Sequence, residues 1–387
     1  MRKFVSDRVA ELEPSGIRKF FDIVSEMPDA ISLGLGEPDF DTPWRVREEG
    51  IYSLERGKTF YTSNAGLKEL RYEISEYLER KYRLVYHPCH EILVTVGGSE
   101  GIDVAMRTIL NPGDEVIVVQ PCFVSYAACV VMAGGTPVIV NLCEEDKFKL
   151  RKEQLEQAVT EKTKAVIFSF PNNPTGAIMT REELEPIAEF AHEHDLLIIS
   201  DEIYSELTYG REHVSIASLP EMKDRCIVIN GFSKAFAMTG WRLGYAAAPR
   251  DLMEQMVKVH QFCIMAAPTT SQYAAIEAMR SCEEEVQEMR TAYNQRRRFL
   301  VHEFRRMHLD CFEPEGAFYI FPSIKKFGMT SEEFAARLLN EEKVAIVPGT
   351  AFGACGEGYL RVSYAYSIEE LKEALGRLKR FIKRLEN

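Results

Sequence analysis

The sequence predicts an α/β protein that has a large sheet domain and a smaller α+β part. Residues 45–280 alternate short apolar runs with amphipathic helical stretches, which is the pattern of βαβ units. From about Glu283 onward, charged helices flank short apolar strands. A chain of 387 residues is long enough for two or three domains. We therefore expect a large domain over residues 45–280 and a smaller domain that contains residues 281–387.

Seven apolar runs in the large domain are predicted to be strands. The first three are residues 92–96, 115–119 and 137–140, with turns at 112–114 and 133–135 between them. The other four are residues 164–170, 195–200, 226–229 and 244–248. In the smaller domain we expect a charged helix over Glu283–Arg306 and a short strand over 317–321. The charge runs 283–285 and 296–298 are expected on solvated helix faces.

The composition narrows the classes of partner. A formal net charge of −12 argues against nucleic acid and anionic membranes. No apolar stretch approaches the roughly 18–20 residues that span a bilayer, and the N-terminus lacks the apolar core of a signal peptide. The nine cysteines have no metal-type or redox-type spacing, so we expect reduced thiols in a cytoplasmic protein. We expect no metal site, although residues 87–90 and 192–194 contain paired histidines.

The segment 230–242 carries the strongest chemical signal. An apolar run leads into Ser233 and Lys234, and Arg242 follows eight residues after the lysine. A lysine buried at the end of a strand can lose its proton and attack a carbonyl, while serine and arginine can hold a phosphate beside it. An amine next to a phosphate clamp suits pyridoxal phosphate bound as a Schiff base. The plain alternative is a solvated surface lysine.

Two further strand ends supply partners for Lys234. The run 195–200 ends in Asp201, with Tyr204 three residues on, and the run 164–170 leads into a turn that contains Asn173. Ligands of open α/β sheets bind at the carboxyl ends of the strands. Asn173, Asp201 and Lys234 are therefore expected around one crevice. The alternative for Asp201 is an ordinary helix N-cap.

These segments, together with residues 32–39 and Arg361, resemble the class I/II aminotransferases, which are fold-type I pyridoxal phosphate enzymes. The matching pieces span nearly the whole chain in the order of the family. Within the family, the chain is most similar to the branch that holds bacterial aspartate, aromatic and acetyl-diaminopimelate aminotransferases. The resemblance implies a mixed, mostly parallel seven-stranded sheet between helices. It also implies that residues 1–44 join 281–387 in the small domain.

The resemblance assigns roles around the cofactor ring. Asp201 would keep the pyridine nitrogen protonated, so that the ring can accept electrons. Tyr204 and Asn173 would donate hydrogen bonds to the phenolic oxygen of the ring. Phe123 would stack on the ring and contact substrate, or else be a core phenylalanine. The neighbouring Glu202 should point away from the ring.

The resemblance also implies a phosphate site at a helix N-terminus. The backbone N–H groups of Gly98, Ser99 and Glu100 would bind the phosphate, with the acidic side chain of Glu100 pointing outward. Ser233 and Arg242 would complete this site. Gly231 stands where many members of the family have serine or threonine, so one hydroxyl contact is expected to be missing.

Substrate contacts are implied at three further positions. Arg361 would bind the α-carboxylate as a planar bidentate pair, the alternative being a structural ion pair. The backbone N–H of Gly36 and the side chain of Asn173 would add contacts. The segment 13–18 is expected to close over the substrate, with Ile17 lining the pocket. Arg18 would reach a distal carboxylate or, as the favoured alternative, be solvated. Ser99 replaces a lysine found in aspartate-specific members, so aspartate is in doubt as the substrate.

Tyr61 matches a tyrosine that crosses to the neighbouring subunit's phosphate, which implies an obligate homodimer. Phe60 beside it is expected in the core. The implied activity is a ping-pong transamination between an L-amino acid and a 2-oxo acid. Alternatives are a lyase or decarboxylase of the same fold and a non-catalytic pyridoxal phosphate sensor. A dinucleotide enzyme is disfavoured because no G-x-G-x-x-G follows a strand.

Overall fold

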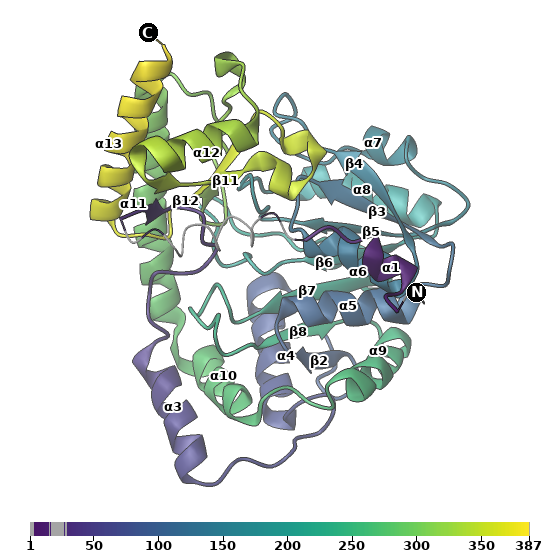
Figure 1. Ribbon diagram of the computed structural model, residues 1–387. Helices are drawn as coiled ribbons and strands as arrows, with labels where there is room; N and C mark the ends of the chain where they lie inside the picture. Colours follow the sequence, from purple (N-terminus) through teal and green to yellow (C-terminus); the bar gives the residue numbers. More distant parts are fainter. Residues whose placement is uncertain (1–3, 15, 17–26, 28, 387) are drawn as a thin grey trace.

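The computed structural model describes residues 4–14, 16, 27 and 29–386, and a seven-stranded sheet lies at its centre (Figure 1). The strands are β2 (Ile92–Thr95), β3 (Glu115–Gln120), β4 (Thr136–Asn141), β5 (Thr163–Ser169), β6 (Leu197–Asp201), β7 (Cys226–Gly231) and β8 (Gly244–Ala247). Their order is β2-β8-β7-β6-β5-β3-β4. In this sheet β8 is antiparallel to both neighbours, and the other pairs are parallel. All seven predicted strands and the mixed, mostly parallel sheet are confirmed.

Helices cover both faces of this sheet, because its strands send alternate side chains into two apolar clusters. Along β3, Ile117 and Val119 join one cluster, whereas Val116 and Val118 join the other. The second cluster includes residues of α5 (Gly98–Ile109), α6 (Ser125–Ala133) and α9 (Arg250–Cys263). The first includes residues of α4 (Lys68–Tyr82), α8 (Arg181–Glu193), α10 (Thr269–Ser281) and α11 (Glu283–Arg306). Burial on both faces explains why the strands read as continuous apolar runs.

A smaller group of elements lies beside the sheet, at the upper left of Figure 1. It contains the antiparallel strands β9 (Tyr319–Ile320), β11 (Val347–Pro348) and β12 (Leu360–Ser363), and the helices α12 (Ser331–Glu342) and α13 (Ile368–Leu385). The N-terminal strand β1 (Ile31–Ser32) pairs in parallel with β10 (Val344–Ala345). This pairing attaches an N-terminal segment to the C-terminal part of the chain.

Short helical segments complete the described chain. They are α1 (Asp7–Ala10), α3 (Trp44–Glu55), α7 (Lys152–Glu156), and the 3₁₀ turns η1 (Ile216–Ser218), η2 (Lys223–Arg225), η3 (Lys325–Phe327), η4 (Gly349–Phe352) and η5 (Ala354–Gly356). Helix α3 packs against α10 at the lower edge of the molecule (Figure 1). These segments connect the larger elements without extending the sheet.

Two expectations about the smaller part need correction. The strand expected over 317–321 is limited to β9, because Ala317 has a positive φ of 57° that interrupts the extended backbone. Arg296 and Arg297 do not lie on a solvated face of α11. Arg296 pairs with Asp39 at 2.7 Å and Arg297 with Glu313 at 3.0 Å. These arginines tie the helix to two loops.

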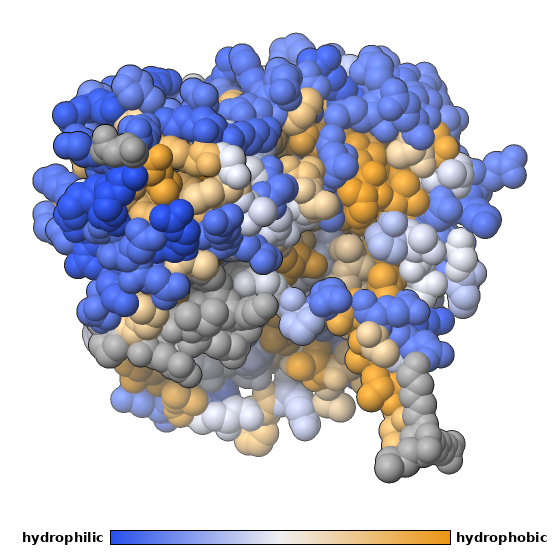
Figure 2. Space-filling view, turned by 45° about the horizontal axis from the view of Figure 1, so that its top comes forward, coloured by the Kyte–Doolittle hydropathy of each residue, from blue (hydrophilic) through white to orange (hydrophobic). Residues whose placement is uncertain are grey.

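The surface agrees with an ordinary globular chain. Figure 2 shows a face that is mostly hydrophilic along its upper edge, with smaller hydrophobic patches toward its centre. Within the part of the chain that the structure describes, no helix combines the length and apolar character required to cross a membrane. All nine cysteines are free thiols.

Candidate active site

Most of the predicted site residues meet in a cavity of about 370 Å³ at the carboxyl ends of β5, β6 and β7. This volume falls in the range of small-molecule sites. Among the residues that line the cavity are Gly36, Gly98, Ser99, Phe123, Asn173, Asp201, Tyr204, Ser233, Lys234, Arg242 and Arg361. Parallel strands bring these residues together because their carboxyl ends lie on one edge of the sheet.

Lys234 follows β7 and projects its amine into the cavity. Its Nζ donates a hydrogen bond to the carbonyl oxygen of Gly36 at 2.6 Å. Burial lowers the pKa of Lys234 from 10.5 to about 8, and the charges of Arg361 and Arg242 add to this lowering, whereas Glu37 opposes it. A substantial fraction of the amine is therefore neutral near physiological pH. The neutral form is the one that attacks a carbonyl or accepts a proton.

Asp201 ends β6 and lines the cavity, where two hydrogen bonds orient its carboxylate. Its carboxylate accepts hydrogen bonds from the Tyr126 hydroxyl at 2.6 Å and from the backbone N–H of Ile203 at 3.1 Å. Burial raises the pKa of Asp201 from 3.8 to about 6, although both donors oppose the rise. Sequence reasoning missed Tyr126, because nothing in the local pattern indicates that α6 brings it to this strand end. A buried carboxylate in this position suits a cationic partner.

The neighbouring Glu202 points away from the cavity, as expected. It is fully buried and accepts from Ser200 at 2.9 Å, Ser215 at 2.6 Å and His213 at 3.0 Å. Adjacent residues of a strand face opposite sides of the sheet. The change of direction at the end of β6 and the three hydrogen bonds of Glu202 together separate these two acidic side chains.

We expect Asp201→Asn to raise the free energy of unfolding of the cofactor-free chain by about 2–3 kcal/mol at pH 8. This figure follows from the pKa of Asp201, which burial raises from 3.8 to about 6. Between pH 3.8 and about 6, the folded chain keeps a proton that the unfolded chain has lost, so the carboxylate costs stability increasingly as pH rises. The gain should shrink strongly at pH 4. Urea unfolding at both pH values measures it, and an equal gain at both would contradict the burial argument. As the control, Glu202→Gln should lower stability, because it disturbs a well-satisfied hydrogen-bond network.

Tyr204 and Tyr319 form a pair beside Lys234. Their hydroxyl groups lie 2.8 Å apart, and the guanidinium of Arg361 stacks over the Tyr319 ring at 4.4 Å. Tyr319 thus connects the tyrosine predicted at the cofactor with the arginine predicted at the substrate. Sequence reasoning placed residue 319 only in a strand and gave it no role. Its short strand carried no separate chemical signal.

Arg361 is 2% exposed and lies on β12, at the wall of the cavity that the smaller part provides. Its Nη1 donates to Asn173 Oδ1 at 3.0 Å, and its Nη2 donates to the carbonyl oxygen of Gly34. Its Nε has no hydrogen-bond partner among the described residues. A buried guanidinium with spare donors that opens into a cavity is suited to a carboxylate.

The N-terminus of α5 forms a corner of the cavity that is suited to an anion. Gly97 precedes the helix with a φ of +79°, and a Cβ there would lie 2.7 Å from Nη2 of Arg242. Glycine thus allows the guanidinium to lie against the turn. The first N–H groups of a helix have no partner within the helix. These donors, Ser233 and Arg242 together can surround a phosphate.

Contacts within the protein explain two features of this corner. The Glu100 side chain lies away from the cavity and accepts from the backbone N–H of Val96 and from His260 Nδ1, the latter at 2.6 Å. Gly231 has no room for the missing hydroxyl side chain. A Cβ on it would lie 2.9 Å from the Cα of Gly244. The close pairing of β7 with β8 therefore requires glycine at this position.

Besides Glu100, which does not line the cavity, three residues predicted at the site are not found there. Tyr61 is 84% exposed, and Phe60 beside it is 81% exposed, which makes the expectation that Phe60 is in the core wrong. The loop that carries both is held at the surface by a hydrogen bond from Thr269 Oγ1 to the Phe60 carbonyl oxygen at 2.8 Å. Ile17 and Arg18 lie outside the described residues.

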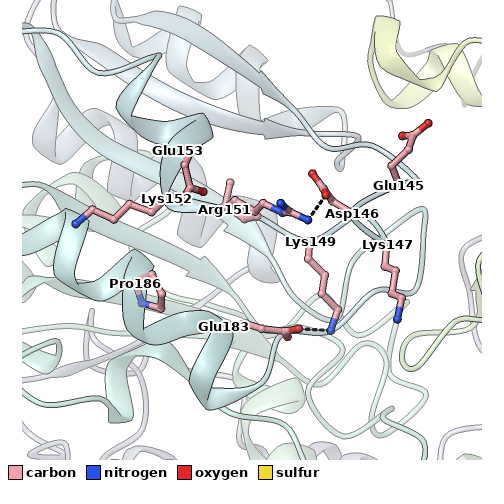
Figure 3. Close-up of a pocket in the computed structure, with 10 residues that line it drawn as sticks. Glu145, Asp146, Lys147, Lys149, Arg151, Lys152, Glu153, Glu183 and Pro186 are labelled. Carbon is pink, nitrogen blue, oxygen red and sulfur yellow. Dashed lines mark hydrogen bonds and ion pairs between the residues drawn. The ribbon is translucent and has the colours of Figure 1, made fainter.

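A second cavity of about 370 Å³ lies at the surface between α7 and α8, and four of its charged side chains form two ion pairs (Figure 3). Lys149 contacts Glu183 at 2.6 Å, and Arg151 pairs with Asp146. Elsewhere, Glu156, Glu193 and His194 bring ligand-type atoms within 4.8 Å of one another, but Glu193 also contacts Lys152 at 2.6 Å. Neither place matches the chemistry of the central cavity.

Comparison with known proteins agrees with this geometry. The chain matches the family described as aminotransferase class I and II over residues 28–378. The Bacillus subtilis (strain 168) protein YugH is 55% identical over 99% of each chain. The aspartate aminotransferase of Pyrococcus abyssi is 47% identical over 98% of each chain. The crystal structure of the aromatic aminotransferase from Pyrococcus horikoshii OT3 has a TM-score of 0.91 at 45% identity, covering 95% of this chain and 99% of that one.

The sheet order and the lysine, aspartate and anion corner at its edge define a fold-type I transferase. The chain belongs to the class I and II aminotransferase family, which depends on pyridoxal phosphate, and it is an aminotransferase. The resemblance stated from the sequence is confirmed. The residues of the cavity fit the family's cofactor, because an amine lies between a buried carboxylate and an anion-binding helix end.

Proposed function

We propose that the chain binds pyridoxal phosphate on Lys234 and transfers amino groups between an L-amino acid and a 2-oxo acid by a ping-pong mechanism. The observation that carries this proposal is the position of the Lys234 amine, with a pKa lowered to about 8 and with Asp201 and Arg361 in the same cavity. An amine that is partly neutral can bind an aldehyde and, once released, move a proton.

Each polar group of the cavity has a task in this proposal. Asp201, oriented by Tyr126, would pair with the ring nitrogen, and Tyr204 and Asn173 would donate to the ring oxygen. Phe123 would cover one face of the ring. Bound pyridoxal phosphate supplies an electron-withdrawing ring that stabilises the charge left when the substrate's Cα proton is removed.

The phosphate would occupy the corner at α5. The backbone N–H groups of Gly98, Ser99 and Glu100, the Ser233 hydroxyl and the Arg242 guanidinium are its proposed ligands. Arg242 also donates from Nη1 to the carbonyl oxygen of Thr239 at 2.9 Å, which orients the guanidinium. The result is a fixed anion site that leaves Lys234 free for proton transfer.

The substrate would be held by its α-carboxylate on Arg361, with the Gly36 backbone nearby. Lys234, Arg242 and Arg361 are the cations among the described residues that line the cavity, and all three have tasks in this proposal. None remains for a second carboxylate. We therefore propose a donor with an uncharged or aromatic side chain, with aspartate as a poorer donor.

Visible spectra of the purified protein, recorded with single L-amino acids, test the function. We expect the cofactor's absorbance to change with an amino acid and to recover with a 2-oxo acid. Phenylalanine, tyrosine or leucine should react with a kcat/KM at least about tenfold above that of aspartate, the size of one unmatched charged contact. A protein that takes up no pyridoxal phosphate would contradict the proposal. A 2-oxo acid formed without any amino acceptor would indicate a lyase instead.

We also propose that residues 45–280 form the large domain, that 1–44 and 281–387 form the small one, and that the protein is a cytoplasmic homodimer. The β1–β10 pairing supports the domain division, and nine free cysteines suit a reducing compartment. The exposure of the aromatic side chains of Phe60, Tyr61 and Phe262 in the single chain supports the dimer, because large apolar side chains at the surface are suited to an interface. Tyr61 would contact the phosphate of the neighbouring subunit.

We expect Phe262→Asp to convert the dimer to folded monomers whose affinity for pyridoxal phosphate is at least about tenfold lower, because a charge would be buried in the interface and the contact of Tyr61 would be lost. Phe262 is 85% exposed in the single chain, so the change should not affect its folding. Analytical ultracentrifugation and a cofactor titration measure both effects. Phe262→Leu, which keeps an apolar side chain, is the matched control. A Phe262→Asp dimer with normal cofactor affinity would argue against this interface.

A further inference from the structure

A buried histidine is attached to the anion-binding corner from a distant part of the chain. Glu100 lies in the first turn of α5, and His260 lies near the end of α9. The Nδ1 of His260 and an Oε atom of Glu100 are 2.6 Å apart. Because a carboxylate can only accept, the histidine N–H is the donor. This contact joins two helices that pack on the same face of the sheet.

The two oxygens of Glu100 are both engaged away from the cavity. Oε1 contacts His260, while Oε2 accepts from the backbone N–H of Val96, just before the helix. The side chain is only 15% exposed. The cavity is lined by Gly98 and Ser99 but not by Glu100. The carboxylate is therefore held behind the turn whose N–H groups face the cavity.

This arrangement prevents the Glu100 carboxylate from occupying the N–H groups at the start of α5. An acidic side chain in the first turn of a helix is attracted by the helix dipole and can accept from the free N–H groups there. Those groups are the proposed phosphate ligands. An unrestrained Glu100 could therefore compete with the phosphate for the same donors or repel its charge. Contact with His260 keeps the carboxylate on the other side of the backbone.

The His260 side chain is fully buried, and its contact with Glu100 accounts for the placement of a polar ring in the core. It has no solvent exposure, and its Nε2 has no hydrogen-bond partner among the described residues. A buried polar atom without a partner costs free energy. The bond to Glu100 is thus the interaction of this ring that compensates for burying a polar side chain.

We propose that His260 is a positioning residue for the cofactor phosphate: by holding Glu100 behind the turn, it keeps the N-terminus of α5 open to the phosphate dianion. The inference rests on the proposed phosphate site. It assigns to α9 a part in cofactor affinity that the cavity residues alone do not reveal.

The test compares the affinities of the full-length chain for pyridoxal phosphate and for pyridoxal, which lacks the phosphate. We expect His260→Leu to weaken binding of pyridoxal phosphate by about tenfold, the effect of one charge-assisted contact, and binding of pyridoxal by less than about twofold. His260→Asn, whose Nδ2 can replace Nδ1 as the donor, should stay near wild type. His260→Met, which fills irregular space, serves the same purpose if the leucine variant does not fold.

A second substitution separates positioning from general damage. In His260→Leu/Glu100→Gln the competing charge is absent, so the preference for pyridoxal phosphate over pyridoxal should return at least in large part. A merely structural role of His260 would not produce this recovery. His213→Leu is the matched control, because His213 also pairs with a buried carboxylate, Glu202, at 3.0 Å. It should not change the ratio of the two affinities.

The possible outcomes distinguish the inference from the function on which it rests. A wild-type chain without any preference for the phosphorylated cofactor would overturn both. A second outcome is that Arg242→Leu reduces the wild-type preference for the phosphorylated cofactor, whereas His260→Leu and His260→Met both leave it intact. This outcome would overturn only the role of His260. Equal weakening of both ligands, or no recovery in the double variant, would also overturn it. Selective weakening followed by recovery supports it.

Discussion

Lys234→Ala is expected to lower turnover of amino acids by at least about 10³-fold, because it removes both the amine that would hold the cofactor and the base that would move the substrate's proton. The Nζ atom contacts the carbonyl oxygen of Gly36 at 2.6 Å, inside the cavity that contains Asp201 and Arg361. No other lysine lines this cavity among the described residues. No replacement amine is therefore present among them.

Two measurements separate these roles of Lys234. Steady-state turnover reports the loss of activity, and mass spectrometry after borohydride reduction reports whether the cofactor becomes permanently attached to the chain. Lys234→Arg should be as inactive as the alanine variant, since a guanidinium keeps its charge but is not deprotonated. Lys258→Ala, at an exposed lysine of α9, is the control and should behave as wild type. Near-normal turnover by Lys234→Ala would refute the assignment.

Arg361→Lys is expected to lower kcat/KM by about 10²–10⁴-fold, since two charge-assisted hydrogen bonds to the substrate's carboxylate are each worth about 1.5–3 kcal/mol. Lysine keeps a positive charge but loses the planar pair of donors. It would also lose the stacking of the guanidinium between Tyr319 at 4.4 Å and Phe352 at 4.7 Å. Both the charge position and the orientation of the donor would change.

The diagnostic measurement for Arg361 uses paired substrates. Wild type should strongly prefer an L-amino acid over the corresponding amine that lacks the α-carboxylate, and Arg361→Lys should lose most of this preference. Arg337→Lys, at a half-exposed arginine of α12, is the control for the substitution itself. If the variant becomes slower but keeps the wild-type preference, Arg361 is structural and its ion pair with substrate is excluded.

The sequence predicted the sheet and most of the cavity for a definite physical reason. The central strands β5, β6 and β7 are buried on both faces, so each is a continuous apolar run, and polar residues that line the cavity follow it. Asp201, Asn173 and Lys234 could be found in this way, since each follows such a run. The helix Glu283–Arg306 was also predicted with its observed bounds, because its charge pattern has clear ends.

Other parts of the site depend on contacts that local pattern cannot contain. Tyr126 reaches Asp201 across 75 positions of sequence, and His260 reaches Glu100 across 160. The expectation that Phe60 is buried failed because an aromatic residue is equally suited to a core and to an interface. Arg296 and Arg297 looked like a solvated charge run until the fold brought Asp39 and Glu313 to them.

The sequence by itself therefore determined the class of fold, because that depends on residue type and on periodicity along the chain, and its motifs were enough for the resemblance to the family that the comparisons confirm. The tertiary structure alone decided how that chemistry is tuned. Burial lowers the pKa of Lys234 to about 8 and raises that of Asp201 to about 6. Hydrogen bonds to Asn173 and His260 orient Arg361 and Glu100, respectively, and the latter bond keeps the Glu100 carboxylate away from the proposed phosphate site. Desolvation and long-range hydrogen bonds arise only when distant segments pack together, so a linear pattern cannot encode them explicitly.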